Sequence, residues 1–211
     1  MGSLAGGMLK FKQFITEERR GGLHVFDIDD TLFHTTARVG VKRGNAPAHT
    51  SLSNSEYNTH QKHPDDEYDY SEFKSADKFN RESKPISNMM GKMKAIHANV
   101  KKSPNSRVVI NTARADFDDK DKFLDTFRKH GVDIDNIHVH RSGNIPGDEP
   151  VAAKKNMAIK HHLDSNKYRH ATLYDDSKDN LNHFLSLKKD YPHMDFKAYH
   201  VQPNGTVKRH R

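Results

Sequence analysis

The chain has 211 residues with a polar, basic composition: 35 Lys and Arg against 28 Asp and Glu give a net charge of +7, beside 16 histidines. Hydrophobic residues make up 33% and the mean hydropathy is −0.96. No run approaches the roughly 18 apolar residues that a membrane-spanning helix needs. Because cysteine is absent, disulfides, thiolate metal sites and a cysteine nucleophile are excluded. The length fits one domain with an insertion, and the charge favours polyanionic partners, above all nucleic acid.

The first 20 residues are expected to form a flexible leader and a short helix. Residues 8–20 place four apolar side chains on one side of a helix, and the glycine pair at 21–22 would end it. No apolar run after the start fits a secretory signal peptide. A cytoplasmic protein is therefore expected, with Met8 as an alternative start.

A short buried strand is predicted over residues 23–26, directly before a run of acidic residues. Residues 38–84 differ from the rest of the chain because they are rich in Ser, Asn, His, Asp and Tyr and poor in aliphatic side chains. We interpret them as an insertion in which aromatic side chains act as anchors. It would hold a β-hairpin at about residues 38–52, followed by short helices.

From residue 85 onward, helical and strand patterns alternate. Helices are predicted over 85–102, 118–130, 151–163 and 179–190, and strands over 107–110, 137–140, 171–174 and 196–201, before a basic tail at 203–211. Short apolar strands that alternate with helices are typical of a parallel sheet covered on both faces. The predicted fold is a three-layer α/β sandwich of Rossmann-like type, with residues 21–37 and 85–202 as its core.

Polar residues follow several of these strands at the point where each ends. Asp27 and Asp29 come after the first strand, Thr112 after the second, and Asp175-Asp176 after the strand at 171–174. The carboxyl ends of parallel strands meet at one edge, where such sheets bind ligands. Carboxylates brought together there would repel one another and raise one another's pKa, and a divalent cation removes the conflict. Clustered oxygen ligands favour Mg²⁺.

These residues resemble the motifs of the haloacid-dehalogenase-like (HAD-like) superfamily of phosphohydrolases. Asp27-Ile28-Asp29-Asp30-Thr31-Leu32 is similar to the first motif (DxDxT), and Thr112 to the second. A lysine that opens the helix at 151–163 is similar to the third motif, and Asp175-Asp176 to the fourth in its paired-Asp form. The resemblance covers residues 23 to about 187. The start after Met8 and the composition of residues 38–84 also resemble proteins of large tailed phages, for which the compartment would be the host cytoplasm.

The resemblance implies roles for these residues. Asp27 would be the nucleophile that forms an aspartyl-phosphate, and Asp29 the general acid and then the base. Thr112 and the lysine would hold the phosphoryl oxygens. Mg²⁺ would bind the Asp27 carboxylate, the main-chain carbonyl of Asp29, and Asp176.

Other residues nearby are expected to support this set. Thr31 would support the turn after the first strand. Asp175 would support the ligands rather than bind the ion, and Asp179 is a weaker candidate for either role.

Several assignments stay open at this point. The third-motif lysine is Lys154 or Lys155, and Lys155 is preferred because the apolar residues four and eight positions later lie on its face. Arg114 would either reach a substrate phosphate or pair at the surface with Asp116 or Asp118. His34 could line the pocket. The histidines at 138, 140, 161 and 162 lack a ligand pattern and are expected to be surface or strand residues.

The function predicted from these features is that of a Mg²⁺-dependent phosphomonoesterase. In this superfamily an insertion at residues 38–84 would be a cap, here a small one that leaves an open site. The open site and the basic charge favour a nucleic-acid terminal phosphate or a nucleotide as substrate. A catalytically silent nucleic-acid-binding or virion-associated module of the same fold is the alternative. A phosphotransferase or a dehalogenase is disfavoured, since dehalogenation needs neither Asp29 nor a metal.

Overall fold

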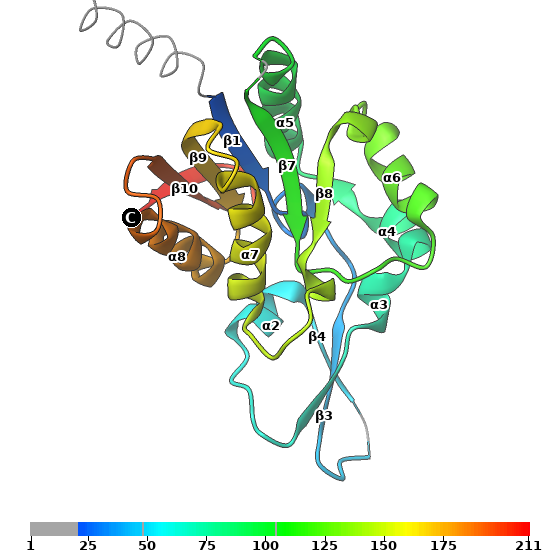
Figure 1. Ribbon diagram of the computed structural model, residues 1–211. Coiled ribbons are helices and arrows are strands. Elements are labelled where there is room, and N and C mark those ends of the chain that lie inside the picture. Colours follow the sequence, from blue (N-terminus) through cyan, green and yellow to red (C-terminus); the bar gives the residue numbers. More distant parts are fainter. Residues whose placement is uncertain (1–20, 48, 104) are drawn as a thin grey trace, which may run out of the picture.

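The computed structural model describes residues 21–211 except 48 and 104 (Figure 1). The helix predicted over residues 8–20 lies outside the described residues. A six-stranded sheet forms the centre of the molecule, in the order β11-β10-β9-β1-β7-β8. Its strands are β1 (Gly21–Phe26), β7 (Arg107–Thr112), β8 (His138–Arg141), β9 (Tyr168–Asp175), β10 (Asp195–Val201) and β11 (Val207–His210). All neighbouring pairs are parallel except β10 with β11. The fold is therefore mixed α/β with a mostly parallel sheet, compatible with the predicted Rossmann-like type.

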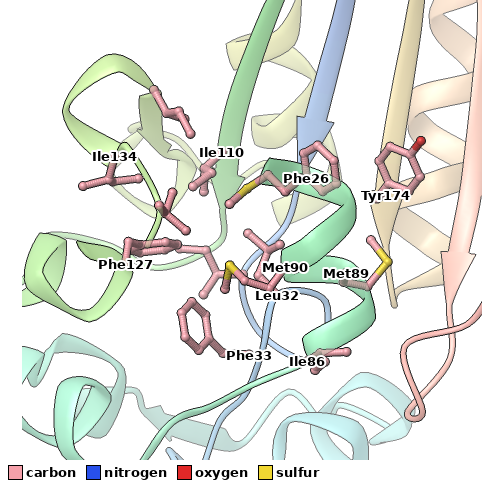
Figure 2. Packing of buried hydrophobic residues seen from close by; sticks show 14 of the residues in the cluster. Phe26, Leu32, Phe33, Ile86, Met89, Met90, Ile110, Phe127, Ile134 and Tyr174 are labelled. Atoms are coloured by element: carbon pink, nitrogen blue, oxygen red, sulfur yellow. The ribbon is translucent and has the colours of Figure 1, made fainter. Parts of the chain in front are cut away.

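Helices pack on both faces of this sheet, because side chains alternate between the faces along each strand. Phe26 and Ile110 join one apolar cluster with α5 (Ser87–Val100) and α6 (Lys120–Arg128). Val25 and Val109 join a second cluster with α7 (Val151–Leu163) and α8 (Lys178–Ser186). Figure 2 shows two methionines of α5 in this first cluster, Met89 on the side of Tyr174 and Met90 near Leu32. Short 3₁₀ turns lie at η1 (Ile134–Asn136), η2 (Ser142–Asn144) and η3 (Leu187–Lys189).

One predicted boundary was wrong. Gly21 and Gly22 begin β1, where a side chain on Gly21 would lie 2.2 Å from the backbone of Asn105, whereas the helix that they were expected to end lies outside the described residues. The predicted basic tail at 203–211 is the sixth strand, β11, which turns back at Gly205 and pairs with β10. Gly205 has a φ of +77°, a conformation that glycine adopts without strain.

Residues 38–84 form a small unit of their own. Its three-stranded antiparallel sheet has the order β4-β3-β5 and consists of β3 (Val39–Arg43), β4 (Thr50–Leu52) and β5 (Asp66–Asp69). The β3–β4 pairing confirms the predicted hairpin. Its helices are α2 (Asn54–Thr59), α3 (Ser71–Lys74) and α4 (Ala76–Glu82), and the two-stranded pairing of β2 (Phe33–His34) with β6 (Lys84–Pro85) brings its ends together.

Phenylalanine rings join this small unit to the sheet. Phe79 of α4 lies 5.2 Å from Phe33 and 5.4 Å from Phe123 between ring centroids. Phe127 of α6 lies edge-on to Phe33 at 5.2 Å and is fully buried. Edge-to-face pairs add to the free energy gained by burial. These rings therefore fix α4 and α6 relative to β2, directly after the acidic run.

Replacement of Phe127 tests this packing. Phe127→Ala is expected to lower the free energy of unfolding by about 3–5 kcal/mol, because it removes a fully buried ring and leaves a cavity. Phe127→Leu, which keeps most of the volume, should cost about 1.5 kcal/mol or less. Urea unfolding followed by circular dichroism measures both. Equal losses for the two variants would show that cavity formation does not control stability here.

Candidate active site

The candidate site lies where the strand order reverses at the centre of the sheet. From β1 the chain passes to β7 and β8 on one side, and later to β9 and β10 on the other. Such a reversal leaves a crevice at the carboxyl ends of the strands. Asp27 follows β1 and Asp175 ends β9, so the two residues flank this crevice. Figure 1 shows α2 at the same end of the sheet.

Lys155, near the start of α7, joins two of the carboxylates. Its Nζ donates to Asp27 Oδ1 at 2.7 Å and to Asp175 Oδ2 at 2.9 Å. The lysine is 4% exposed, and no described carboxylate pairs with its neighbour Lys154. The structure thus brings Lys155, the preferred of the two lysines, into the site. An ammonium group has three donors, so one remains for a further acceptor.

A polar chain positions the start of α7 against β7. Asn111 donates from Nδ2 to the carbonyl oxygen of Lys155 at 2.9 Å, and Ser142 Oγ donates to Asn111 Oδ1 at 2.6 Å. Both side chains are buried. Gly143 allows the close approach of η2, since a Cβ there would lie 2.3 Å from the carbonyl oxygen of Ala113. Sequence reasoning missed this support because Asn111 carries no motif of its own.

The two adjacent aspartates at the end of β9 have different surroundings. Asp175 is fully buried, and its oxygens accept from Lys155, from the Ser177 amide at 2.9 Å and from Asn180 Nδ2 at 2.9 and 3.1 Å. Asp176 accepts only a long bond of 3.4 Å from Asn58 of α2 among the described side chains. Asp176 therefore keeps free oxygen lone pairs, whereas those of Asp175 are engaged.

Asp29 pairs with a buried arginine. Arg114 donates from Nη2 to Asp29 Oδ1 at 2.6 Å and from Nε to Asp29 Oδ2 at 2.9 Å, a two-pronged geometry. Its other donors reach Thr35 Oγ1 and the carbonyl oxygen of Phe73, and the guanidinium lies 4.7 Å from the Phe79 ring centroid. Of the two alternatives left open for Arg114, a surface pair with Asp116 or Asp118 was wrong, because residues 73–79 cover this side chain.

The acidic run after β1 turns sharply. Backbone bonds from Thr31, Leu32 and Phe33 converge on the carbonyl oxygen of Ile28, and the Asp30 amide donates to Phe33. None of these bonds uses the carbonyl oxygen of Asp29 as its acceptor. Asp30 has a φ of +55°, in the left-handed region that aspartate tolerates better than most residues.

The side chains of this turn have unequal partners. Asp30 accepts from Asn54 of α2 at 2.8 Å and lies 3.7 Å from the His34 ring nitrogen. The Thr31 backbone takes part in the predicted turn, but its hydroxyl is buried without a described partner. Thr112 is buried at the end of β7, and its hydroxyl accepts from the Arg114 amide at 3.2 Å. The Thr112 hydroxyl proton is therefore free for another acceptor.

Burial and mutual repulsion perturb the acids. Burial, partly offset by Lys155 and reinforced by Asp175 and Asp29, raises the pKa of Asp27 to about 7. Burial and the charges of Asp175 and Asp27 raise the pKa of Asp176 well above its usual value. Burial opposes the charge on Lys155, but Asp175 and Asp27 outweigh it and raise the pKa of that ammonium.

These acids fit a divalent cation. One oxygen each of Asp27, Asp175 and Asp176 lie within 4.8 Å of one another. Lys155 contacts Asp27 and Asp175, whereas no described cation contacts Asp176. Carboxylate oxygens are the ligands that Mg²⁺ prefers. The free oxygens of Asp27 and Asp176 suit this role better than Asp175.

A cavity of about 510 Å³ lies beside Asp176. Residues from α2, from the loop after β9 and from the end of β10 line it, and His34 does so as anticipated. His200 anchors one wall through a bond to the Asp176 carbonyl oxygen at 2.9 Å. The cavity is open to solvent and largely polar in its side chains, so it suits a hydrophilic group attached to whatever binds at the acids.

The remaining predicted residues lie elsewhere. Asp179 is exposed at the rim of this cavity, 3.4 Å from His183, while Asn180 takes the contact with Asp175. The rings of the histidines at 138, 140, 161 and 162 contact one another. His138, His161 and His162 line a cavity at the amino ends of β7 and β9, and His140 pairs in register with Asn111. Asn54 and Asn58 of α2 were not foreseen, because only the fold brings residues 54–58 to the acids.

No model of a known protein family and no curated protein matches the chain. None of the helices in residues 21–211 that the structure describes is long and apolar enough to cross a membrane.

The perturbed acid gives a pH-dependent test. The pKa of Asp27 is 3.8 in the unfolded chain and about 7 in the folded protein. Below pH 3.8 Asp27 is protonated in both states and does not lower the free energy of unfolding. As the pH rises from 3.8 to about 7, only the unfolded state releases the proton, so the free energy of unfolding falls. Asp27→Asn removes this loss. The variant should gain on the order of 2 kcal/mol over wild type between about pH 4.5 and pH 8 in metal-free buffer.

Urea unfolding with EDTA at each pH measures the difference. The buried histidines titrate alike in both proteins and cancel. A difference between the two proteins that does not change with pH would contradict the raised pKa of Asp27.

Proposed function

We propose that the protein is a Mg²⁺-dependent phosphomonoesterase of HAD-like type that acts through an aspartyl-phosphate. One observation carries the proposal: Asp27, at the carboxyl end of the central strand, lies 2.7 Å from a buried lysine and within 4.8 Å of two further aspartate oxygens. A carboxylate held beside cations can approach a phosphate dianion that it would otherwise repel.

In the first step an Asp27 carboxylate oxygen attacks phosphorus. A bond from this oxygen to phosphorus forms and the bond from phosphorus to the leaving alkoxide oxygen breaks. Asp29, which enters this step protonated, gives that oxygen its proton and is left as a carboxylate. In the second step Asp29 takes a proton from water, whose oxygen attacks phosphorus, and the bond to Asp27 breaks. Inorganic phosphate leaves and Asp27 is restored.

Lys155 and Thr112 would hold the phosphoryl oxygens. Lys155 has one donor beyond its bonds to Asp27 and Asp175, and the Thr112 hydroxyl has its proton free. Both groups are buried, so their hydrogen bonds to phosphate would be strong. The lysine also offsets part of the negative charge that phosphate meets.

Asp27, Asp176 and the Asp29 carbonyl would hold Mg²⁺. When bound, the ion neutralises charge between carboxylate and phosphate. Asp175 would instead keep Lys155 and Asn180 in place. This division follows from the free oxygens of Asp176 and the engaged oxygens of Asp175.

The leaving group would occupy the cavity beside Asp176. Residues 38–84 would act as a small cap, since α2 reaches Asp30 and Asp176 through Asn54 and Asn58. The open cavity, whose lining residues are mostly polar or charged, suits a nucleotide or a nucleic-acid terminal phosphate. A cytoplasmic location, that of the host if the chain is viral, belongs to the same proposal.

Hydrolysis of p-nitrophenyl phosphate tests the reaction. Wild type should hydrolyse it with Mg²⁺ and lose activity with EDTA, and Asp27→Asn should reduce kcat by about 10⁴-fold or more, because the nucleophile is lost. The control is Asp190→Asn, which alters an exposed aspartate paired with Lys160. No turnover by wild type, together with salt-sensitive DNA binding, would favour the silent binding module instead.

Arg114 tests how Asp29 is positioned. Arg114→Gln should lower kcat by about 100-fold or more with little change in KM, because it removes the two-pronged bond that orients the acid. Arg141→Gln, at an exposed arginine paired with Asp116, is the matched control. A higher KM with unchanged kcat would show that Arg114 binds substrate and does not orient Asp29.

A further inference from the structure

A second cavity lies at the opposite end of the sheet from the acids. Its volume is about 230 Å³, and its walls come from the starts of β7, β8 and β9 and from the end of α7. Arg107 and Thr112 are the two ends of β7, so the two sites are separated by about 16 Å of strand. The second cavity therefore shares no side chain with the candidate active site.

The side chains around this cavity carry positive charge and no negative charge. Arg107, Lys167, His138, His161 and His162 line it, and the other lining residues are neutral. Arg107 and Lys167 are exposed, and neither has an ion-pair partner among the described residues. Two cations without a carboxylate partner at one concavity leave a local excess of positive charge.

The histidine rings experience this excess. Burial, followed by the charges of Arg107 and His161, lowers the pKa of His138. Burial lowers the pKa of His162 to about 4, with contributions from His138, Arg107 and His161. No carboxylate contributes at either ring. A bound anion would therefore offset the positive charge around these imidazoles.

A metal cation suits the same histidines less well. His140 and His162 face each other with 2.6 Å between their Nε2 atoms, as a hydrogen-bonded pair. Within the described residues the histidines do not form a group of three with ligand atoms close enough to share an ion. A cation would also be repelled by Arg107 and Lys167, with no carboxylate to compensate.

We propose that this cavity binds a phosphate-class oxyanion. The guanidinium of Arg107 offers paired donors that match phosphate oxygens, Lys167 adds a point charge, and His161 adds a ring donor at the rim. The anion is either free, as inorganic phosphate, or a phosphodiester of a nucleic-acid strand. The proposal does not depend on the phosphatase activity.

Histidine ring resonances in NMR spectra report the site directly. Inorganic phosphate is titrated into the metal-free protein at constant ionic strength, with rings assigned through His161→Gln and His138→Gln. The resonances of His161 and His138 should shift and saturate. Arg107→Gln and Lys167→Gln should each weaken binding about tenfold, since each removes a charged donor.

Lys188→Gln is the matched control, because it removes an exposed lysine outside the cavity. It should leave the dissociation constant unchanged, and thermal melts check that each variant is folded. Shifts that do not saturate, or equal weakening by Lys188→Gln, would overturn the proposal. Shifts confined to residues near Asp27 would overturn it as well.

A short oligothymidylate without terminal phosphate distinguishes the sources. Tighter binding of the oligonucleotide at the same rings, weakening with salt, would assign the site to a nucleic-acid backbone. Binding of phosphate alone would assign it to the free anion. Binding of neither probe overturns the site.

Discussion

The bond of Lys155 to Asp27 and Asp175 is the interaction on which the candidate site depends. It joins three elements, β1, α7 and β9, through one buried ammonium. Without this cation, two buried carboxylates at neighbouring strand ends would repel each other, and one would have to be protonated. Lys155 therefore offsets part of the repulsion between the assembled acids, while burial and the neighbouring carboxylates still raise the pKa of Asp27. On the proposed function, a divalent cation would offset the rest, so that stability and ligand binding would be coupled at this point.

Much of this arrangement could be predicted from sequence because its signals are local. A short stretch of sequence is enough to recognise a strand that ends in acidic residues. It is also enough to recognise the helix whose apolar face starts at Lys155. The pairing of Arg114 with Asp29 was not predictable in this way. It joins residues 85 positions apart, and it needs residues 73–79 to cover the guanidinium. In the same manner Asn180, and not the weaker candidate Asp179, contacts Asp175, because the third residue of α8 after the N-cap Ser177 points back toward the strand end.

The one wrong boundary has a physical origin in the sheet. The segment 207–210 has the charge of a tail, yet an edge strand exposes much of its surface and tolerates Lys and Arg. A tertiary contact also explains the glycines at the start of β1, because β1 passes close to the Asn105 backbone and the His170 ring. In both places the composition suits a tertiary contact that no local pattern encodes.

The net charge of +7 is unevenly distributed, so the two ends of the sheet differ in the ligands that they would attract. The carboxyl end of the sheet holds uncompensated carboxylates, whereas the amino end holds unpaired cations around the second cavity. A polyanion would therefore be attracted first to the amino end, and the candidate active site would attract phosphate only after a cation neutralises its acids. On the proposed function, a divalent ion then serves entry of the substrate as well as chemistry, because the acids would otherwise repel any phosphorylated group before Lys155 could bind it.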